Sequence, residues 1–394
     1  MDQHMAWQRV DADRVIDLAV RLVRQPSQQT ELFERDPAVL DLIRGPVLAE
    51  LREIPGLQIE FDGMQNLLAR LPGPETGRPL LLVAYAMTPQ AGTMKEAFSG
   101  EIRDGAPFGI EGPVIWGRGV CEQKAGLAAM IEGLRAAVAS GQPRRRPVIL
   151  LVSTAGETGR HDSVRTGVAA LGLTEGMGIV GLGTDLQICL ANKGRIDVQI
   201  EVHGRVAHSS VPWEGVNAIE GVRRVLNRVA EIDLPRQHPL LGPASLAPIH
   251  LRSFPDATHT VQGLVRLTLD RRLLPGDDPS AVLSELTEHI RSDPALGEEF
   301  RVEVSPGPTM YPSEVPADAE IVRLLQASAA AAGAGPLELT SSPQAMDAGY
   351  LNHAGIETVM FAPGDVKWAH TPQEVASTDQ IVAGARIYAE LAVR

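Results

Sequence analysis

The sequence predicts an α/β protein that carries a smaller, inserted α+β domain. In the first half of the chain, apolar runs such as 80–84 and 148–152 alternate with amphipathic helical patterns, which indicates a mainly parallel sheet with helices on both faces. Apolar and polar residues then alternate strictly in "RIDVQIEVHG", as in a half-exposed antiparallel strand. Because an α/β pattern returns near residue 312, we expect a discontinuous catalytic-type domain (1–195 and 312–394) around an inserted domain (196–311).

The elements of the first part follow from local patterns. Asp11 can cap a helix whose apolar residues recur at helical spacing up to Val23, and this helix should end near Pro26. The remaining elements predicted in this part are strands at 67–71, 80–84 and 148–152, and a strand, glycine turn and helix over 115–140.

The inserted part alternates strands and helices. We expect strands at 195–204, 264–276 and 301–305, with helices at 217–230 and 279–292. The proline-rich stretch 305–316 follows the last of these strands. A helix over 318–332 then begins the last part.

Composition excludes several classes of function. The formal net charge of −13 and the pI near 5.3 argue against nucleic acid or an anionic membrane as the main partner. The two cysteines, Cys121 and Cys189, form no disulfide framework, which favours a reducing compartment. We see no signal-peptide pattern and no apolar stretch of membrane-spanning length. These observations predict a cytoplasmic protein.

Five motifs occur in a characteristic order: "GRGVCEQKAG" (117–126), "GETG" (156–159), "GRVAHSSVPWEGVNAI" (204–219), "LDRRLLPG" (269–276) and "AHTPQE" (369–374). In this order and spacing they resemble the dinuclear zinc aminoacylase and deacetylase-type metallopeptidases, which include acetylornithine deacetylase, succinyl-diaminopimelate desuccinylase and glutamate carboxypeptidase. The resemblance implies a zinc-peptidase fold, a mixed sheet flanked by helices, with an inserted α+β lid that is also the dimerisation domain in many members.

The resemblance also implies a metal site, but several of its residues are replaced. The family's first metal-binding histidine and the aspartate that orients it correspond to Ala84 and Ala86, and a later acidic ligand corresponds to Leu182. The glutamate that serves as general base corresponds to Gly156. The replaced ligands belong to one metal of the pair.

The other side of the site is retained. Glu122 stands at the position of the bridging aspartate, Glu157 at a ligand position beside the missing base, and His370 at the last histidine. One interpretation is a three-ligand site for a single divalent metal, most readily zinc, with Glu122 and Glu157 also catalytic. The other is a metal-free cavity in which the same three residues bind substrate or move protons.

Three further residues match functional positions of the family. His208 resembles the lid histidine that, in dimeric members, reaches the neighbouring active site and stabilises the oxyanion. Arg272 matches a position that binds a substrate carboxylate in some members, although pairing with Asp270 is the alternative. His259 falls near an asparagine that contacts substrate in several relatives.

Four residues near the motifs are candidates to replace the missing base, namely Cys121, Tyr85, His161 and Asp185. Each also has a structural interpretation. For Cys121, the neighbouring acids should raise the thiol pKa and so oppose nucleophilic chemistry.

Three hypotheses about function follow. The first is a repurposed enzyme acting on an amide- or carboxylate-bearing molecule such as an N-acyl amino acid, by mononuclear hydrolysis or by metal-independent cyclisation, elimination or acyl transfer. The second is a non-catalytic protein that binds a small acid or a partner protein. The third is an orthodox dinuclear amidohydrolase with displaced ligands. In each case the family predicts a homodimer formed through the inserted domain.

Overall fold

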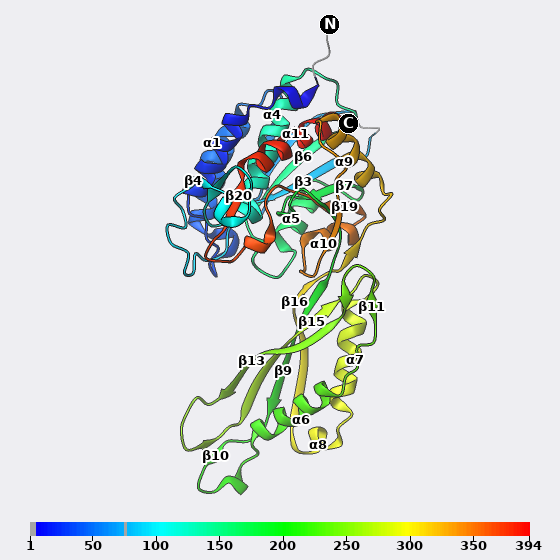
Figure 1. Ribbon diagram of the computed structural model, residues 1–394. Helices are drawn as coiled ribbons and strands as arrows, with labels where there is room; N and C mark the ends of the chain where they lie inside the picture. Colours follow the sequence, from blue (N-terminus) through cyan, green and yellow to red (C-terminus); the bar gives the residue numbers. More distant parts are fainter. Residues whose placement is uncertain (1–4, 75–76) are drawn as a thin grey trace. The chain divides into compact units, whose positions relative to one another are not determined.

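The computed structural model describes residues 5–74 and 77–394 (Figure 1). The chain forms two compact units. The first unit comprises 1–191, 314–341 and 350–394, and the second comprises 192–313 and 342–349. The sequence pattern predicts domain boundaries after residues 195 and 311, whereas the boundaries between the two units lie after residues 191 and 313.

The first unit holds a large sheet, a small sheet and most of the helices. Its helices are α1 (Ala12–Arg24), α2 (Pro37–Leu42), α3 (Leu48–Arg52), α4 (Ala125–Ala139), α5 (Asp162–Ala170), α9 (Glu320–Ala331) and α11 (Thr378–Val393). Its strands are β1 (Gln58–Phe61), β2 (Leu67–Leu71), β3 (Leu80–Tyr85), β4 (Glu101–Asp104), β5 (Pro113–Trp116), β6 (Val148–Ser153), β7 (Gly176–Val180), β19 (Ile356–Met360) and β20 (Val375–Ser377). Elements that span a boundary are β8 (Ile188–Asn192), β17 (Ser313–Glu314), β18 (Leu339–Ser342) and α10 (Asp347–His353).

The large sheet is mixed, as the sequence predicts. Its strands lie in the order β1-β2-β6-β3-β7-β19-β8-β17, with β18 also paired to β8. The central strands β6, β3, β7 and β19 are parallel, and all their residues are buried except Glu357 on β19. Antiparallel β2 and β8 flank them. Because β3 and β6 are parallel neighbours, the segments that follow them start at the same edge of the sheet, where α/β proteins place their ligands.

Helices α4 and α11 lie side by side, with α1 against α4 (Figure 1). Close packing of α4 on α11 requires a glycine at position 133, because a Cβ there would lie 2.6 Å from the Cβ of Tyr388. Asp11 caps α1 by accepting a hydrogen bond from the Arg14 N–H, as its position in the sequence predicts. Among the described residues, none of the helices has both the length and the apolar character needed to cross a bilayer.

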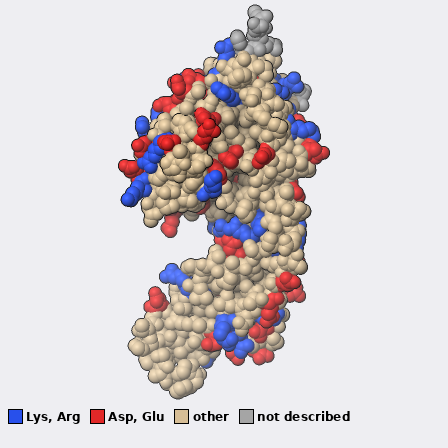
Figure 2. All heavy atoms as spheres, viewed as in Figure 1, with Lys and Arg blue, Asp and Glu red and all other residues tan. Residues whose placement is uncertain are grey.

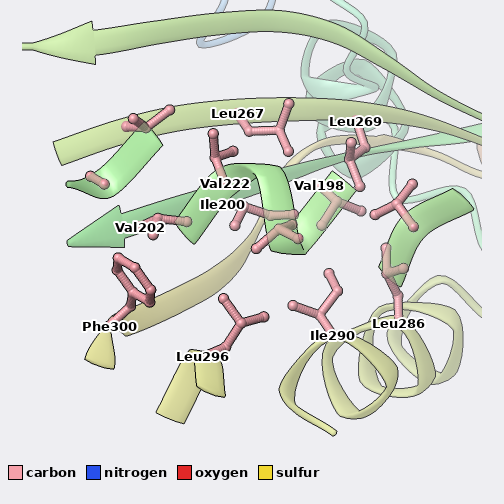
Figure 3. Packing of buried hydrophobic residues seen from close by; sticks show 14 of the residues in the cluster. Val198, Ile200, Val202, Val222, Leu267, Leu269, Leu286, Ile290, Leu296 and Phe300 are labelled. Atoms are coloured by element: carbon pink, nitrogen blue, oxygen red, sulfur yellow. The ribbon is translucent and has the colours of Figure 1, made fainter. Parts of the chain in front are cut away.

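The second unit is a four-stranded antiparallel sheet with helices on one face. Strands β13 (Ser245–Phe254), β15 (Leu264–Leu273), β9 (Gly194–His203) and β16 (Arg301–Met310) pair in that order. Residues such as Val198 and Leu267 pack against α6 (Ala218–Ala230), α7 (Pro279–Arg291) and α8 (Pro294–Glu299) in one apolar core (Figure 3). Two-residue strands complete the unit, namely β10 (Ala207–His208), β11 (Gln237–His238), β12 (Gly242–Pro243) and β14 (Thr260–Val261).

The last strand of the second unit is longer than predicted. The sequence pattern predicts a strand at 301–305, whereas β16 continues through the prolines to Met310. The register shifts between Pro306 and Thr309, and β16 lies at a sheet edge. An edge strand tolerates proline because the missing N–H can lie on its unpaired side.

Candidate metal centre

The three retained residues Glu122, Glu157 and His370 come together in the first unit. His370 Nε2 lies 3.2 Å from Glu122 Oε2 and 3.9 Å from Glu157 Oε1. One donor atom from each residue lies within 4.8 Å of the donor atoms of the other two. The Glu122 side chain is mostly buried, whereas that of His370 is 53% exposed. The cluster is therefore open to solvent on the histidine side.

A tight turn places Glu122. Gly119 has a φ of 80° and begins the single π turn η5 (Val120–Lys124), which leads into α4. A Cβ at Gly119 would lie 2.2 Å from Thr88 Cγ2, so both the backbone angle and the close approach require glycine. The turn carries Glu122 to the sheet edge at the start of α4.

Glu157 lies in the loop after β6, and Gln29 holds that loop. Gln29 Oε1 accepts hydrogen bonds from the backbone N–H groups of Gly156 at 3.3 Å and of Glu157 at 2.9 Å. Gln29 is 8% exposed. The sequence analysis did not predict this role of Gln29, because nothing in the residues around it indicates a contact with a loop more than 100 residues away.

A buried ion pair joins the segments of Glu122 and His370. Arg118 Nη1 donates to Glu374 Oε2 at 2.8 Å, and the two side chains are 2% and 0% exposed. Glu374 Oε1 accepts from the Cys121 N–H at 3.2 Å. Arg118 Nη2 donates to the Thr371 carbonyl at 3.0 Å, beside His370, whose φ of 61° is left-handed. The pair thus fixes the backbone next to two of the three clustered residues.

Gln123 bridges the two carboxylates. Its Nε2 donates to Glu122 Oε2 at 2.8 Å and to Glu157 Oε1 at 3.3 Å. Its Oε1 is buried and makes no hydrogen bond. The sequence analysis gave Gln123 no role. Its position next to Glu122 in "GRGVCEQKAG" is the one sequence signal that could have indicated it.

The clustering shifts the proton affinities. Burial, then the nearby Glu122 carboxylate, raise the pKa of Glu157 to about 7. The hydrogen bond to Glu122 raises the pKa of His370 to about 8. Near neutral pH the cluster therefore holds a protonated imidazole against two carboxyl groups, an arrangement that complements a cation once the protons leave.

Comparison with known proteins identifies the family. Residues 88–394 match peptidase family M20/M25/M40. The chain belongs to this family. It is 27% identical to an acetylornithine deacetylase of Myxococcus xanthus over 274 residues, which cover 68% of this chain and 69% of that protein.

Solved M20 structures have the same fold. An M20 family metallo-carboxypeptidase from Sulfolobus solfataricus matches 96% of this chain and 98% of its own, with a TM-score of 0.75 and 16% identity. A Bacillus subtilis protein, described as a dinuclear metal binding peptidase of the M20 family, matches 97% of each chain with a TM-score of 0.67 and 14% identity. The zinc-peptidase fold with an inserted domain is thereby confirmed.

The residues of this M20 chain fit one divalent cation. Two carboxylate oxygens and an imidazole nitrogen are a ligand set that zinc accepts, with positions left open. The Gln123 hydrogen bonds do not exclude ligation, because each carboxylate oxygen has two lone pairs. The unpaired Gln123 Oε1 beside the cluster offers a further acceptor.

The residues that the sequence motifs align with the family's second metal are apolar and packed. Ala84 and Ala86 are fully buried, and Leu182 is 7% exposed. A Cβ at Gly156 would lie 2.2 Å from Met87 Cε and 2.8 Å from the Tyr85 ring. The side chains next to the two alanines therefore occupy the space beside Gly156.

The four candidates to replace the general base each have contacts within the protein. Burial and Glu374 raise the pKa of Cys121 well above its usual value, and Tyr85 is 2% exposed. The His161 ring lies 5.6 Å from that of Tyr350, centroid to centroid, and Asp185 accepts a hydrogen bond from Gln380. Each of the four residues therefore has packing or electrostatic contacts of its own, and its role as a replacement base stays a prediction.

The second unit brings His208 and His259 together. Strand β10 pairs with β14 so that His208 lies opposite Thr260, and the Ser209 N–H donates to the His259 carbonyl at 2.9 Å. The Ser210 N–H donates to His208 Nδ1 at 3.2 Å. Because that nitrogen accepts, the proton of the neutral ring is assigned to Nε2, which becomes a donor.

Arg272, in the same unit, has a protein partner. Its Nε and Nη2 donate to the two oxygens of Asp270 at 2.8 and 3.0 Å. This is the pairing that the sequence analysis gave as the alternative to a substrate carboxylate. The Arg272 side chain is 28% exposed.

Proposed function

We propose that this M20 protein is a repurposed amide-processing enzyme that holds one divalent cation at Glu122, Glu157 and His370. The observation that carries the proposal is the convergence of these three donors within 4.8 Å, while the second metal's positions are apolar. The substrate class is an N-acyl amino acid or a similar small molecule with an amide and a carboxylate, by analogy with the acetylornithine deacetylase that the chain resembles.

The bound cation would supply Lewis-acid polarisation of the amide carbonyl. In the metal-free variant of the proposal, Glu157, whose pKa is raised to about 7 by burial and by Glu122, can exchange a proton with the substrate. His208 presents its Nε2–H as a donor for a developing oxyanion. Arg272 and His259 are the proposed contacts for the substrate carboxylate.

The loss of the glutamate at position 156 sets the expected rate. General-base catalysis contributes about 10²–10⁴-fold, so turnover by the usual family route should be slow. Metal-independent cyclisation, elimination or acyl transfer in the same cavity is the variant of the proposal in which the three residues bind substrate directly.

The test is a metal count combined with substitution. Protein purified without chelator should hold one zinc or similar ion per chain by elemental analysis, and N-acetyl-L-ornithine is the first probe of turnover. Glu122→Gln, Glu157→Gln and His370→Ala should each lose the metal and at least 100-fold in rate. The surface variant Glu175→Gln serves as the control.

Each outcome decides between the hypotheses. Two metals per chain would favour the orthodox dinuclear enzyme. No metal, with turnover that resists chelation and yet needs the three residues, would favour metal-independent chemistry. Turnover that survives all three substitutions would refute the proposed site, and ligand binding without any turnover would leave the non-catalytic protein.

We also propose a homodimer formed through the second unit. Strands β13 and β16 are the sheet edges, and β16 carries Pro306 and Pro308. Strand β13 exposes Ile249 and Leu251, which are 55% and 49% accessible. A long edge strand with exposed apolar side chains favours pairing with a second copy.

A further inference from the structure

We propose that the second unit carries a separate binding site for a dibasic amino acid, in a cavity between β15 and helix α7. The cavity has a volume of about 390 Å³ and is lined by residues of the second unit alone. The site shares no residue with the metal centre, and the proposal does not depend on the proposed function.

The first observation is an arginine in an apolar row. Val265, Leu267 and Leu269 alternate along β15 on the face that packs against the helices, and Arg271 continues that row. Directly opposite Arg271 lie Leu246 on β13 and Ile196 on β9, both of which belong to or pack against the core.

Arg271 is buried without a carboxylate partner. It is 8% exposed, it lines the cavity, and its Nη1 donates to the carbonyl of Arg272. Among the described residues no carboxylate lies within ion-pair distance of it. Asp277, which attracts it most, is already paired with Arg236, and Glu285 of the same cavity attracts it less. Burial of an unpaired charge is costly, so a core position alone would favour leucine. A ligand carboxylate would supply the missing partner.

Two exposed carboxylates, Glu285 and Asp233, also line the cavity. Glu285 stands on the face of α7 that also presents Val282 and Leu286, and Asp233 follows α6. Neither carboxylate forms an ion pair within the described part of the chain, whereas the third acid of the lining, Glu231, pairs with Arg228. The cavity therefore offers one unpaired guanidinium and two unpaired carboxylates.

This charge pattern complements a molecule with one carboxylate and two ammonium groups. Leu246, Val282 and Leu286 form an apolar wall, against which a short methylene chain can pack. Lysine and ornithine have these features together. In the proposed complex the ligand carboxylate binds Arg271, and the two ammonium groups bind Glu285 and Asp233.

The experiment is calorimetric titration of the full chain with L-lysine and L-ornithine. Norleucine lacks the side-chain ammonium and cadaverine lacks the carboxylate, so each should bind about 10- to 100-fold more weakly, the loss expected for one charged hydrogen-bonding partner. Arg271→Met and Glu285→Gln should weaken lysine binding by the same factor. Arg252→Met, on exposed β13, is the matched control and should bind normally.

Two further measurements separate this site from the metal centre and from misfolding. His370→Ala should bind lysine as the unchanged protein does, because an amino acid held at the metal centre would be lost in that variant. Arg271→Met should melt at the same or a higher temperature, since an unpaired buried charge is removed. Absence of binding at about 10 mM ligand, or binding that survives Arg271→Met, would overturn the proposal.

Discussion

Gly156 is the residue at which the proposed chemistry departs from the family pattern, and its surroundings make the change hard to reverse. A Cβ there would lie 2.2 Å from Met87 Cε and 2.8 Å from the Tyr85 ring. We predict that Gly156→Ala destabilises the protein by about 1–3 kcal/mol, as overpacking does, and that Gly156→Glu does not restore deacylase activity. Chemical denaturation and an N-acetyl-L-ornithine assay check the two parts.

A control and a second variant identify the cause. Gly63→Ala adds a methyl group where nothing lies within 4 Å, so it should change stability by less than about 1 kcal/mol. In a Met87→Ala background, Gly156→Ala should cost less, with a coupling energy of at least about 0.5 kcal/mol. Equal costs in both backgrounds would contradict the packing explanation.

The clustered titratable groups predict how the metal-free protein responds to pH. The pKa of Glu157 rises from 4.5 to about 7 on folding and that of His370 from 6.5 to about 8. In both cases the folded state binds more protons than the unfolded state, so stability falls as pH rises. We expect these two groups to make the metal-free protein lose stability between about pH 5 and pH 7; above pH 7, buried Lys124, whose pKa is lowered to about 7, opposes the loss.

Urea denaturation with chelator, at one-unit steps of pH, measures this slope. In Glu157→Gln the part between about pH 4.5 and 7 should disappear, while the part due to His370 remains. Saturating zinc should reverse the trend, because the metal binds the deprotonated ligands and its affinity rises with pH. A stability that increases with pH without metal would show that the two shifts are absent.

At the residue scale, the sequence predicts the chemistry-bearing side chains better than those that hold them. Glu122, Glu157 and His370 belong to motifs with recognisable order, and the structure brings them together. Gln29 lies in no motif, and Gln123 lies in one without matching a ligand position. The roles of both depend on backbone N–H groups and carboxylates brought near by folding. The steric closure around Gly156 likewise depends on tertiary distances.

The Arg118–Glu374 ion pair acts at the scale of elements, because it connects the turn before α4 to the loop before β20. We predict that Glu374→Gln leaves the Arg118 charge buried and uncompensated, at a cost of about 3–5 kcal/mol. It should also lower zinc affinity about 10- to 100-fold, as loss of a supporting partner does. Denaturation and competition with a zinc chelator give the two quantities.

Exposed pairs provide the comparison. Glu220→Gln removes the partner of Arg223 on α6, where both side chains are 58% exposed, and should cost less than about 1 kcal/mol. Zinc affinity should not change in that variant. If Glu374→Gln keeps full zinc affinity, the pair is structural and does not position the metal centre.

Helices and strands that are set by local sequence signals could be predicted, whereas features that depend on tertiary context could not. Asp11 and the apolar positions of α1 are local signals, and the predicted helix begins where the structure has it. The extension of β16 through Pro306 depends on its place at a sheet edge, which a local pattern cannot give. The boundaries of the inserted domain shift by two to four residues because β8 and β17 continue across them.

For the whole molecule, the exposed edge β13 predicts an oligomer. Of the two long edge strands in the described part of the second unit, β16 carries two prolines and β13 carries one. Replacement of both Ile249 and Leu251 by lysine places positive charge along β13. We expect a dimer for the unchanged protein and a monomer for this variant by light scattering. Leu339→Lys, at an exposed apolar position in the first unit, should remain dimeric.

The proposed dimer would allow His208 to serve the active site of the other subunit, and mixed subunits can test this. His208→Ala and Glu157→Gln proteins should each be inactive alone. If His208 acts across the dimer, a hybrid of the two has one intact site, and an equal mixture that exchanges subunits should recover about a quarter of the original rate. If His208 acts within its own chain, every site of the hybrid lacks one residue, and the mixture should stay inactive. A mixture of His208→Ala with a protein that carries both Glu157→Gln and the β13 substitutions should also stay inactive, since it forms no hybrid.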